Sequence, residues 1–561
     1  MSLYSVSSVI VAATFTFVLS PAVAADDYDL LIRGGTIYDG SGADGYLGDL
    51  AISKDRIAYV GEQAPGTARE VIDAKGLAVA PGFINMLSWG YRTLSRNGRG
   101  ESDIRQGVTL EVMGEGSSNG PYTSAMQKSR KVTYSTLGGA LDALVERGVS
   151  PNVASFVGAS TVRVNVLGQS DAEPDEAELY EMRALVREAM LEGAMGVGTA
   201  LIYSPGSYAS TDELVALASE AAQCGGIYIS HMRSEGDRLL EAIDELIDIS
   251  RRSGAPAEIF HLKQAGQHNW GKLDAAIERI EEARASGLRI TANMYPYTVA
   301  GTGLSAAMPT WVRKGGFASW RERLQDPAIR ARVAAEMQQP GDGWENLYYA
   351  SGGPGNVIFS SFRSEALRPL AGRTLADVAK ERGTTPEATM MDLVVEDGSR
   401  VEVLYRLMSE DNVRRQIGLP WMSFGSDGAA ATITQKSASS RGHPRVYGTF
   451  ARVLGHYVRE LDAMPLADAI RRMTSLPAAT LGLRDRGRLQ EGYYADIAVF
   501  DPESIIDRAT VEVPAVYAVG MQHVLVNGTP VLRDAEHTGA TPGRVVRGPG
   551  WQGWEDGGKC P

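Results

Sequence analysis

The sequence predicts an α/β protein in which a TIM-like (β/α)8 barrel stands beside a small composite β-sandwich domain built from both termini. Short apolar segments alternate with amphipathic ones through the middle of the chain, and similar β-rich segments lie near both ends. Strands alternating with helices are typical of parallel sheets, and eight such units can close into a barrel. A doubly wound open sheet is the alternative, but no GxGxxG motif follows the first apolar segment to support it.

The first residues have the pattern of an export signal. An apolar run at 8–19 is followed by the small-residue pattern "AVA" at 22–24 and then by polar residues. We therefore expect residues 1–24 to be a signal peptide and the mature protein to be periplasmic or secreted. Residues 1–8 contain no Lys or Arg, and an uncleaved membrane anchor is the alternative, although the run is short for a membrane span.

Two β-rich regions flank the middle of the chain. Strand-like segments separated by Gly and Asp turns fill residues 28–79, and the same pattern returns at 486–533. We assign 25–79 and 476–545 to the two parts of the β-sandwich, and 546–561 to a tail.

Residues 80–475 are expected to form the barrel. A helix is expected over 178–193, and another between the fifth and sixth strands, where Leu239, Ile243 and Leu246 recur at helical spacing. An insertion at 303–420 separates the seventh and eighth strands, and such insertions often form lids. The expected strands are 78–86, 108–114, 152–158, 195–200, 226–231, 257–261, 288–294 and 421–426.

Composition excludes some classes of function. The formal net charge is −13 and no Lys/Arg-rich run is present, which argues against nucleic-acid binding. No segment after the signal is long and apolar enough to cross a bilayer, so we expect no membrane association once the signal is removed. The two cysteines, Cys224 and Cys560, could pair in an exported protein, but they cannot form a cysteine-based zinc site.

Polar residues stand at the ends of four predicted strands. Glu115 ends the second strand, His231 the fifth, His261 the sixth and Asp427 the eighth. Reacting groups of barrel enzymes lie at this face, and two histidines with a carboxylate can hold a catalytic zinc ion. Asp427 could move a proton between water and a leaving amine. The residues alone leave other roles open: a surface loop carboxylate for Glu115, a helix N-cap for Asp427 and structural hydrogen bonding for a histidine.

Segments spread over nearly the whole mature chain resemble one enzyme family. They include "DIRQGVTLEVMGEG", "GAMGVGTALIYSPGSYASTDEL", "ISHMRSEGDRLLEAIDE", "IFHLKQAG", "YPYTVAGTGL", "SFGSDG" and "HPRVYGTFARVLG". In combination they resemble the D-aminoacylase (N-acyl-D-amino-acid deacylase) branch of the amidohydrolase superfamily. That family has a TIM-like barrel beside a small β-sandwich, which agrees with the order of segments above.

The resemblance implies roles for the residues at the strand ends. His231 and His261 match the two tightly held zinc-binding histidines of the family. Glu115 stands where many members place a bridging cysteine, and a carboxylate is an acceptable substitute ligand. Asp427 matches the catalytic acid/base.

The resemblance also implies a set of substrate-binding residues. Tyr203 matches a tyrosine near the substrate carbonyl, and Lys263 follows the second histidine as in the family; its state as a carbamate, hydrogen-bond donor or salt-bridge partner stays open. Tyr295, Thr302 and Arg445 lie where the family binds the α-carboxylate. A guanidinium can pair with a carboxylate in a bidentate way, although a surface arginine before a turn is the alternative for Arg445.

The sequence departs from the family pattern at two places. The Asp-x-His-x-His pattern that usually ends the first strand is replaced by Asn85, Leu87 and Trp89, and the Gly-His after the third strand is Gly158-Ala159. We therefore expect no second metal site and one zinc ion per chain. Leu87 and Trp89 are expected to make this wall of the site apolar, with Trp89 contacting substrate or core.

Together these features predict an exported zinc amidohydrolase acting on a small molecule. The expected reaction cleaves the amide of an N-acyl-D-amino acid into a carboxylate and a free D-amino acid, with Asp427 accepting the proton of water and passing it to the departing nitrogen. A hydrolase of another amide, such as a dipeptide or cyclic amide, is one alternative. A non-catalytic periplasmic binding protein is the other, because the histidine pair is missing.

Overall fold

The computed structural model describes Met1, residues 27–434 and residues 441–561. The predicted signal peptide, residues 1–24, lies outside the described residues apart from Met1. Within the described part of the chain, no helix has the length and apolar character needed to cross a membrane.

Within the described residues, eight parallel strands form the centre of the fold, counting β8 and β9 as one. Each lies within a segment that the sequence predicts to be a strand. A bridge between Ser88 and Gly428 brings the last strand back to the first, an order consistent with a (β/α)8 barrel. The strands are β6 (Phe83–Asn85), β7 (Val108–Met113), β8 (Asn152–Ser155) continued by β9 (Val157–Gly158), β10 (Gly196–Ala200), β11 (Ile227–His231), β12 (Ala257–Ile259), β13 (Ile290–Met294) and β17 (Met422–Phe424).

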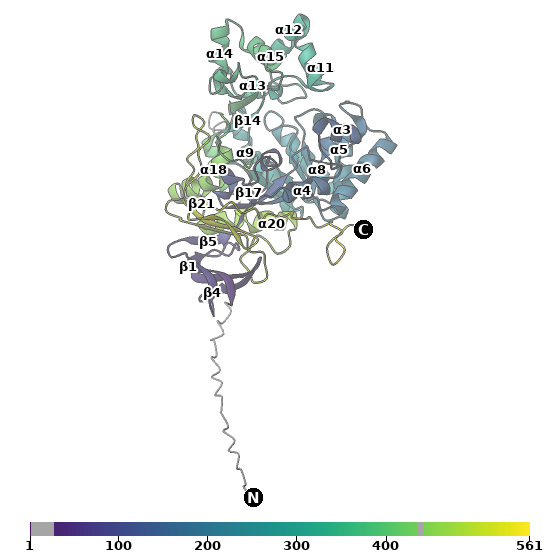
Figure 1. The fold of residues 1–561 in the computed structure, drawn as a ribbon. Coiled ribbons are helices and arrows are strands. Elements are labelled where there is room, and N and C mark those ends of the chain that lie inside the picture. The colour runs from purple at the N-terminus through teal and green to yellow at the C-terminus, as the bar shows by residue number, and fades with distance from the viewer. Residues whose placement is uncertain (2–26, 435–440) are drawn as a thin grey trace.

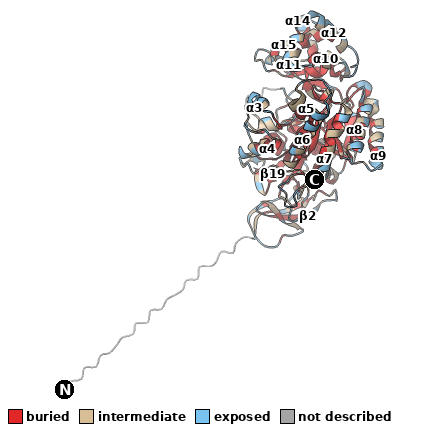
Figure 2. Cartoon of the chain, turned by 90° about the vertical axis from the view of Figure 1, so that its right-hand side faces the viewer, coloured by how far each residue is buried: buried red, intermediate tan, exposed pale blue. Residues whose placement is uncertain are grey.

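Helices surround these strands and carry both buried and exposed residues (Figure 2). The two predicted helices are confirmed as α6 (Glu176–Leu191), which begins at a capping box formed by Asp175 and Glu178, and α8 (Leu239–Ser253), which buries Leu239, Ile243 and Leu246. The others are α4 (Leu137–Glu146), α5 (Ala159–Leu167), α7 (Thr211–Gln223), α9 (Leu273–Ala285), α16 (Glu410–Ile417), α18 (Arg445–Arg452) and α19 (Leu466–Met473), with the short helices α1 (Tyr91–Leu94), α2 (Glu101–Ile104), α3 (Ser124–Arg130) and α20 (Ser475–Leu481).

Both ends of the chain enter one nine-stranded sheet among the described residues. Strand β5 joins the two parts, because it pairs with β1 on one side and with β18 on the other. The composite unit is thus built from both termini, whereas its folding into a two-layered sandwich stays a prediction, as do the domain boundaries. The strands are β1 (Tyr28–Ile37), β2 (Tyr46–Ser53), β3 (Arg56–Gly61), β4 (Ala68–Asp73), β5 (Ala78–Pro81), β18 (Ile497–Phe500), β19 (Met521–Val526), β20 (Thr529–Arg533) and β21 (Glu536–His537).

The predicted strand 78–86 is two strands rather than one. Strand β5 belongs to the composite sheet and β6 pairs with β7 in the barrel, with Gly82 between them. A Cβ atom at Gly82 would collide with the side chain of Thr109, so glycine is needed where the chain passes from one sheet to the other.

The insertion at 303–420 folds around a core of its own. Strands β14 (Val299–Gly303), β16 (Glu402–Arg406) and β15 (Val357–Ser361) form an antiparallel sheet, and the core includes Met308, Trp320, Phe359 and Met390. It lies at the end of the molecule opposite the composite sheet (Figure 1). Its helices are α10 (Thr310–Arg313), α11 (Gly316–Arg323), α12 (Pro327–Met337), α13 (Leu347–Ala350), α14 (Leu375–Arg382) and α15 (Pro386–Asp397).

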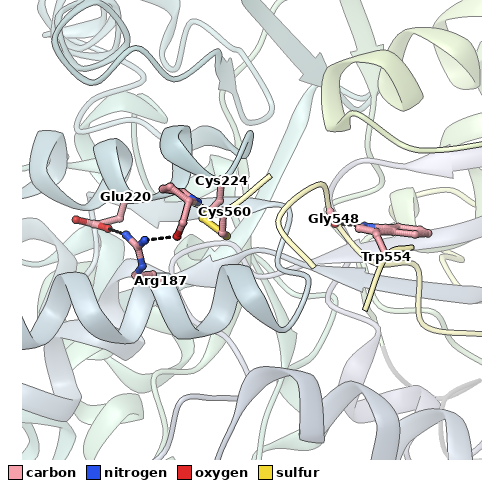
Figure 3. The surroundings of a disulfide bond; sticks show 7 residues. Arg187, Glu220, Cys224, Gly548, Trp554 and Cys560 are labelled. Atoms are coloured by element: carbon pink, nitrogen blue, oxygen red, sulfur yellow. Dashed lines mark hydrogen bonds and ion pairs between the residues drawn. A yellow bond between two sulfur atoms is a disulfide. The ribbon is translucent and has the colours of Figure 1, made fainter. Parts of the chain in front are cut away.

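A disulfide between Cys224 and Cys560 ties the C-terminal tail to the end of α7 (Figure 3). Arg187 on α6 adds a hydrogen bond to the carbonyl of Pro561, at 2.8 Å, and an ion pair with Glu220. The sequence left the state of the two thiols open, and the structure assigns them to this bond.

Candidate functional site

Four residues predicted at strand ends come together at one end of the barrel. Glu115 follows β7, His231 ends β11, His261 follows β12 and Asp427 follows β17, and all except Asp427 are buried outright. The four line one cavity of about 850 Å³. The five predicted substrate-binding residues line the same cavity: Tyr203, Lys263, Tyr295, Thr302 and Arg445.

Glu115 is the point on which both histidines converge. Its Oε1 atom lies 2.9 Å from Nδ1 of His231 and 3.1 Å from Nε2 of His261. Burial would raise the pKa of the Glu115 carboxyl, but hydrogen bonds with the two imidazoles outweigh burial and hold this pKa below its ordinary value. Glu115 is therefore a buried carboxylate rather than a surface one.

The three residues fit a divalent metal ion. One possible ligand atom from each of Glu115, His231 and His261 lies within 4.8 Å of the other two. Two imidazole nitrogens and one carboxylate oxygen form a donor set that zinc accepts, with a fourth position left for water or substrate.

Glu235 was not singled out from the sequence, yet it contacts both histidines. Its Oε1 atom lies 2.8 Å from Nδ1 of His261, and its Oε2 atom lies 3.6 Å from Nε2 of His231. The contact with His261 is at hydrogen-bond distance, whereas Nε2 of His231 has no hydrogen-bond partner among the described residues and only faces the charge of Glu235. A carboxylate bonded to the outer nitrogen of a metal-binding imidazole orients the ring. Lys263 forms an ion pair with this same carboxylate. In the sequence, Glu235 is marked only by its position four residues after the predicted metal ligand His231.

Asp427 is held by contacts at both carboxylate oxygens. Oδ2 lies 2.9 Å from Nη1 of Arg445, and Oδ1 accepts a hydrogen bond from Nε1 of Trp89 at 3.0 Å. Burial raises the pKa of the Asp427 carboxyl although Arg445 opposes the increase, and such a shift suits a general acid/base. No helix begins at Asp427 within the described residues 428–434, so the N-cap alternative finds no support.

Backbone strain marks two of these positions. His261 and Asp427 adopt φ values of 36° and 45°, in the left-handed region that favours glycine. Such conformations persist only where surrounding contacts hold them, and they concentrate at functional sites. The amide of His261 donates to Oδ1 of Asn293 at 2.9 Å, and the amide of Asp427 donates to the carbonyl of Leu87 at 2.9 Å.

Arg445 presents a buried cation to the cavity. Its guanidinium carbon lies 4.5 Å from the ring centroid of Tyr295, and among the described residues its Nε atom has no hydrogen-bond partner. Its backbone amide donates to Nδ1 of His443, whose Nε2 donates to the carbonyl of Val299. Arg445 is therefore a buried, supported group with free donor capacity, not the surface arginine that was the alternative.

Tyr203 and Thr302 form a hydroxyl pair at the wall of the cavity. Their hydroxyl oxygens lie 2.7 Å apart, and the ring of Tyr203 lies edge-on to His231 with the centroids 5.4 Å apart. Burial raises the pKa of Tyr203, so the phenol stays protonated and can donate a hydrogen bond into the cavity.

The expectation of an apolar wall at Leu87 and Trp89 needs correction. Leu87 is buried, but Trp89 is 47% exposed and directs its indole N–H at Asp427. Asn85 is polar and buried: its Oδ1 atom accepts from the amide of Ser426, at 2.8 Å, and its Nδ2 atom donates to Glu111 at 3.0 Å. The end of the first barrel strand therefore anchors the segment that carries Asp427.

Comparison with known proteins places this site in context. The amidohydrolase family model matches residues 70–532. A D-aminoacylase of Alcaligenes xylosoxydans xylosoxydans is 34% identical over 92% of this chain and 97% of its own length. The structure also resembles a solved N-acyl-D-glutamate deacylase of Bordetella bronchiseptica, which is complexed with zinc and a phosphonate mimic of the tetrahedral intermediate. The TM-score is 0.75 at 30% identity, and the match covers 93% of this chain and 99% of that one. A D-aminoacylase structure described by its binuclear metal centre, with one-metal activation and second-metal attenuation, gives a TM-score of 0.76 at 31% identity, covering 93% of this chain and 100% of that one.

Replacing Glu235 by Gln should lower metal affinity by about 10- to 100-fold, because the neutral amide lacks the negative charge that faces both imidazoles and pairs with Lys263. Competition against a chelator measures the change. Glu345→Gln is the matched control, since Glu345 is buried nearby and accepts from the amide of Glu235 but no hydrogen bond or ion pair links it to either histidine. Equal affinities of the wild type and Glu235→Gln would show that Glu235 does not orient the ligands.

A buried carboxyl that Asn293 links to the backbone of His261 should make stability depend on pH. Glu258 on β12 accepts from Asn293 and Thr291, each at 2.7 Å, and burial raises its pKa to about 7. Because the folded pKa lies above the unfolded one, this contribution is full below about pH 4.5 and is lost as pH rises through about 7. Glu258→Gln should reduce the fall in melting temperature between pH 4.5 and 8, whereas Gln at the exposed position Glu282 should leave that fall unchanged. Falls of equal size in the wild type and in Glu258→Gln would refute the assignment.

Proposed function

The chain belongs to the amidohydrolase family, within its D-aminoacylase branch, and we propose that it is a zinc enzyme that hydrolyses the amide bond of N-acyl-D-amino acids to a carboxylate and a free D-amino acid. The observation that carries this proposal is the convergence of His231 and His261 on Glu115 in a cavity that also holds Asp427. The names of the similar proteins supply the class of substrate.

The chemistry divides between the metal and the side chains around it. A zinc ion held by Glu115, His231 and His261 would polarise the amide carbonyl and lower the pKa of a water molecule. Asp427 accepts the proton of the attacking water and later gives it to the departing nitrogen, so the same carboxyl is base and then acid. The protonated phenol of Tyr203, kept in place by Thr302, donates to the oxygen that becomes negative as the carbonyl is attacked.

Substrate recognition falls to the cationic side of the cavity. The α-carboxylate of an N-acyl amino acid is an anion, and Arg445 offers it a buried guanidinium with an Nε–H that lacks a partner among the described residues. Tyr295 packs against that guanidinium, and Nζ of Lys263 lies 5.6 Å from the Tyr295 ring centroid. Since the anion must sit on this side, the acyl amide is directed toward the metal ligands.

We propose one zinc ion per chain. The residues that replace the family's first-strand histidines are Leu87 and Trp89, and Ala159 replaces the histidine after the third strand; none of the three side chains offers a metal ligand. The relative with one-metal activation and second-metal attenuation supports an active site that needs a single metal.

We also propose that the mature enzyme is exported. The predicted signal at residues 1–24 motivates this, and the Cys224–Cys560 disulfide supports it independently, because disulfides persist mainly in oxidising compartments. Mass spectrometry of the native protein should find an N-terminus at Ala25 or Asp26 and an oxidised Cys224–Cys560 peptide. An N-terminus at Met1 together with two free thiols would contradict export.

Zinc-loaded protein should cleave N-acetyl-D-amino acids in a screen that includes the L-enantiomers, dipeptides and cyclic amides. Asp427→Asn should keep its zinc and lose about 10²- to 10⁴-fold in kcat, because the amide cannot transfer the proton. Asp485→Asn is the matched control, an exposed aspartate that also has positive φ but lies in the composite-sheet region of the chain. Cleavage of dipeptides or cyclic amides alone would change the substrate class, and zinc binding without any turnover would favour a binding protein.

A further inference from the structure

Trp89 stands where the family pattern has a histidine, and its side chain is directed at the proposed acid/base. Nε1 of Trp89 lies 3.0 Å from Oδ1 of Asp427, while nearly half of the side chain remains exposed at the wall of the cavity. An indole has one N–H, which can only donate. Its partner here is a carboxylate oxygen, so the contact is a charge-assisted hydrogen bond whenever Asp427 is ionised.

The backbone on either side fixes this contact. The amide of Trp89 donates to the carbonyl of Gly428 at 2.8 Å, and the amide of Asp427 donates to the carbonyl of Leu87 at 2.9 Å. Two short segments, 87–89 and 427–428, are thus joined as neighbouring strands, which places the indole and the carboxylate side by side. These backbone bonds keep the two residues adjacent, and the hydrogen bond from the indole N–H then sets the orientation of the Asp427 carboxylate.

The other carboxylate oxygen of Asp427, Oδ2, pairs with a residue that is also proposed to bind substrate. Oδ2 lies 2.9 Å from Nη1 of Arg445, the residue proposed to bind the substrate carboxylate. When that anion pairs with Arg445, the attraction between Arg445 and Asp427 weakens, and Oδ2 becomes available to accept a proton. Among the described residues, Oδ1 accepts its hydrogen bond from the N–H of Trp89, which has no part in binding the substrate carboxylate.

We propose that Trp89 is a positioning residue for Asp427: its indole N–H holds Oδ1 while Oδ2 exchanges Arg445 for the attacking water. The inference rests on the proposed function. The water proton goes to Oδ2, the water oxygen bonds to the acyl carbon, and the proton then leaves Oδ2 for the amide nitrogen as the carbon–nitrogen bond breaks. Trp89 loses and gains no proton in this sequence.

Trp89→Phe keeps an aromatic ring and removes the donor. We expect kcat to fall by about 10- to 100-fold, the loss expected when one hydrogen bond to a charged group is removed. KM should stay within about threefold of the wild-type value, and the zinc content should be unchanged. Trp554→Phe is the matched control, because Trp554 donates to the carbonyl of Gly548 in the C-terminal tail, at 3.0 Å. An unchanged kcat would overturn the inference, and a raised KM with normal kcat would show that Trp89 contacts substrate instead.

A spectroscopic measurement keeps the inference testable if no substrate is turned over. In ¹⁵N-tryptophan-labelled protein, the indole signal missing from Trp89→Phe identifies Trp89. That signal should shift in Asp427→Ala, because its acceptor is gone, while the Trp554 signal stays in place. A Trp89 signal unmoved by Asp427→Ala would refute the contact, whereas absence of turnover in the wild type alone would refute only the proposed function.

Discussion

The site depends on one buried carboxylate that receives two imidazoles. Glu115 brings Nδ1 of His231 and Nε2 of His261 to the same oxygen atom, although the three residues come from strands far apart in the sequence. A barrel whose strands all end at one face places these residues within a few ångströms of one another. A carboxylate buried here without such partners would be costly, so in the absence of metal the histidines and Glu115 stabilise each other.

A second set of polar groups fixes the orientation of the first. Glu235 faces the outer nitrogens of both rings, and Asn293 holds the strained backbone at His261. Asn85 holds the segment that carries Asp427, and Trp89 holds its side chain. The end of the first barrel strand therefore contributes hydrogen-bonding side chains, Asn85 and Trp89, beside the proposed acid/base.

The sequence predicts the barrel strands because each is a short apolar segment, and it predicts the site because polar residues end those segments. Glu235 is not found this way: it lies in a loop, where no periodicity tells which way a carboxylate points. The hydrogen bond from Trp89 to Asp427 depends on pairing between the first and last strands, which spacing cannot reveal. The division of the first predicted strand at Gly82 has a similar cause, since both halves are apolar and only their partners differ.

The central claim is that one metal ion occupies the Glu115–His231–His261 set and that the Leu87 and Trp89 side holds none. Diffraction data collected at the zinc absorption edge from crystals grown with excess zinc test this directly. The account predicts a single strong anomalous peak in the cavity, within bonding distance of all three side chains. A second peak bound by Asp427 near Trp89, or no peak at the three residues, would contradict it.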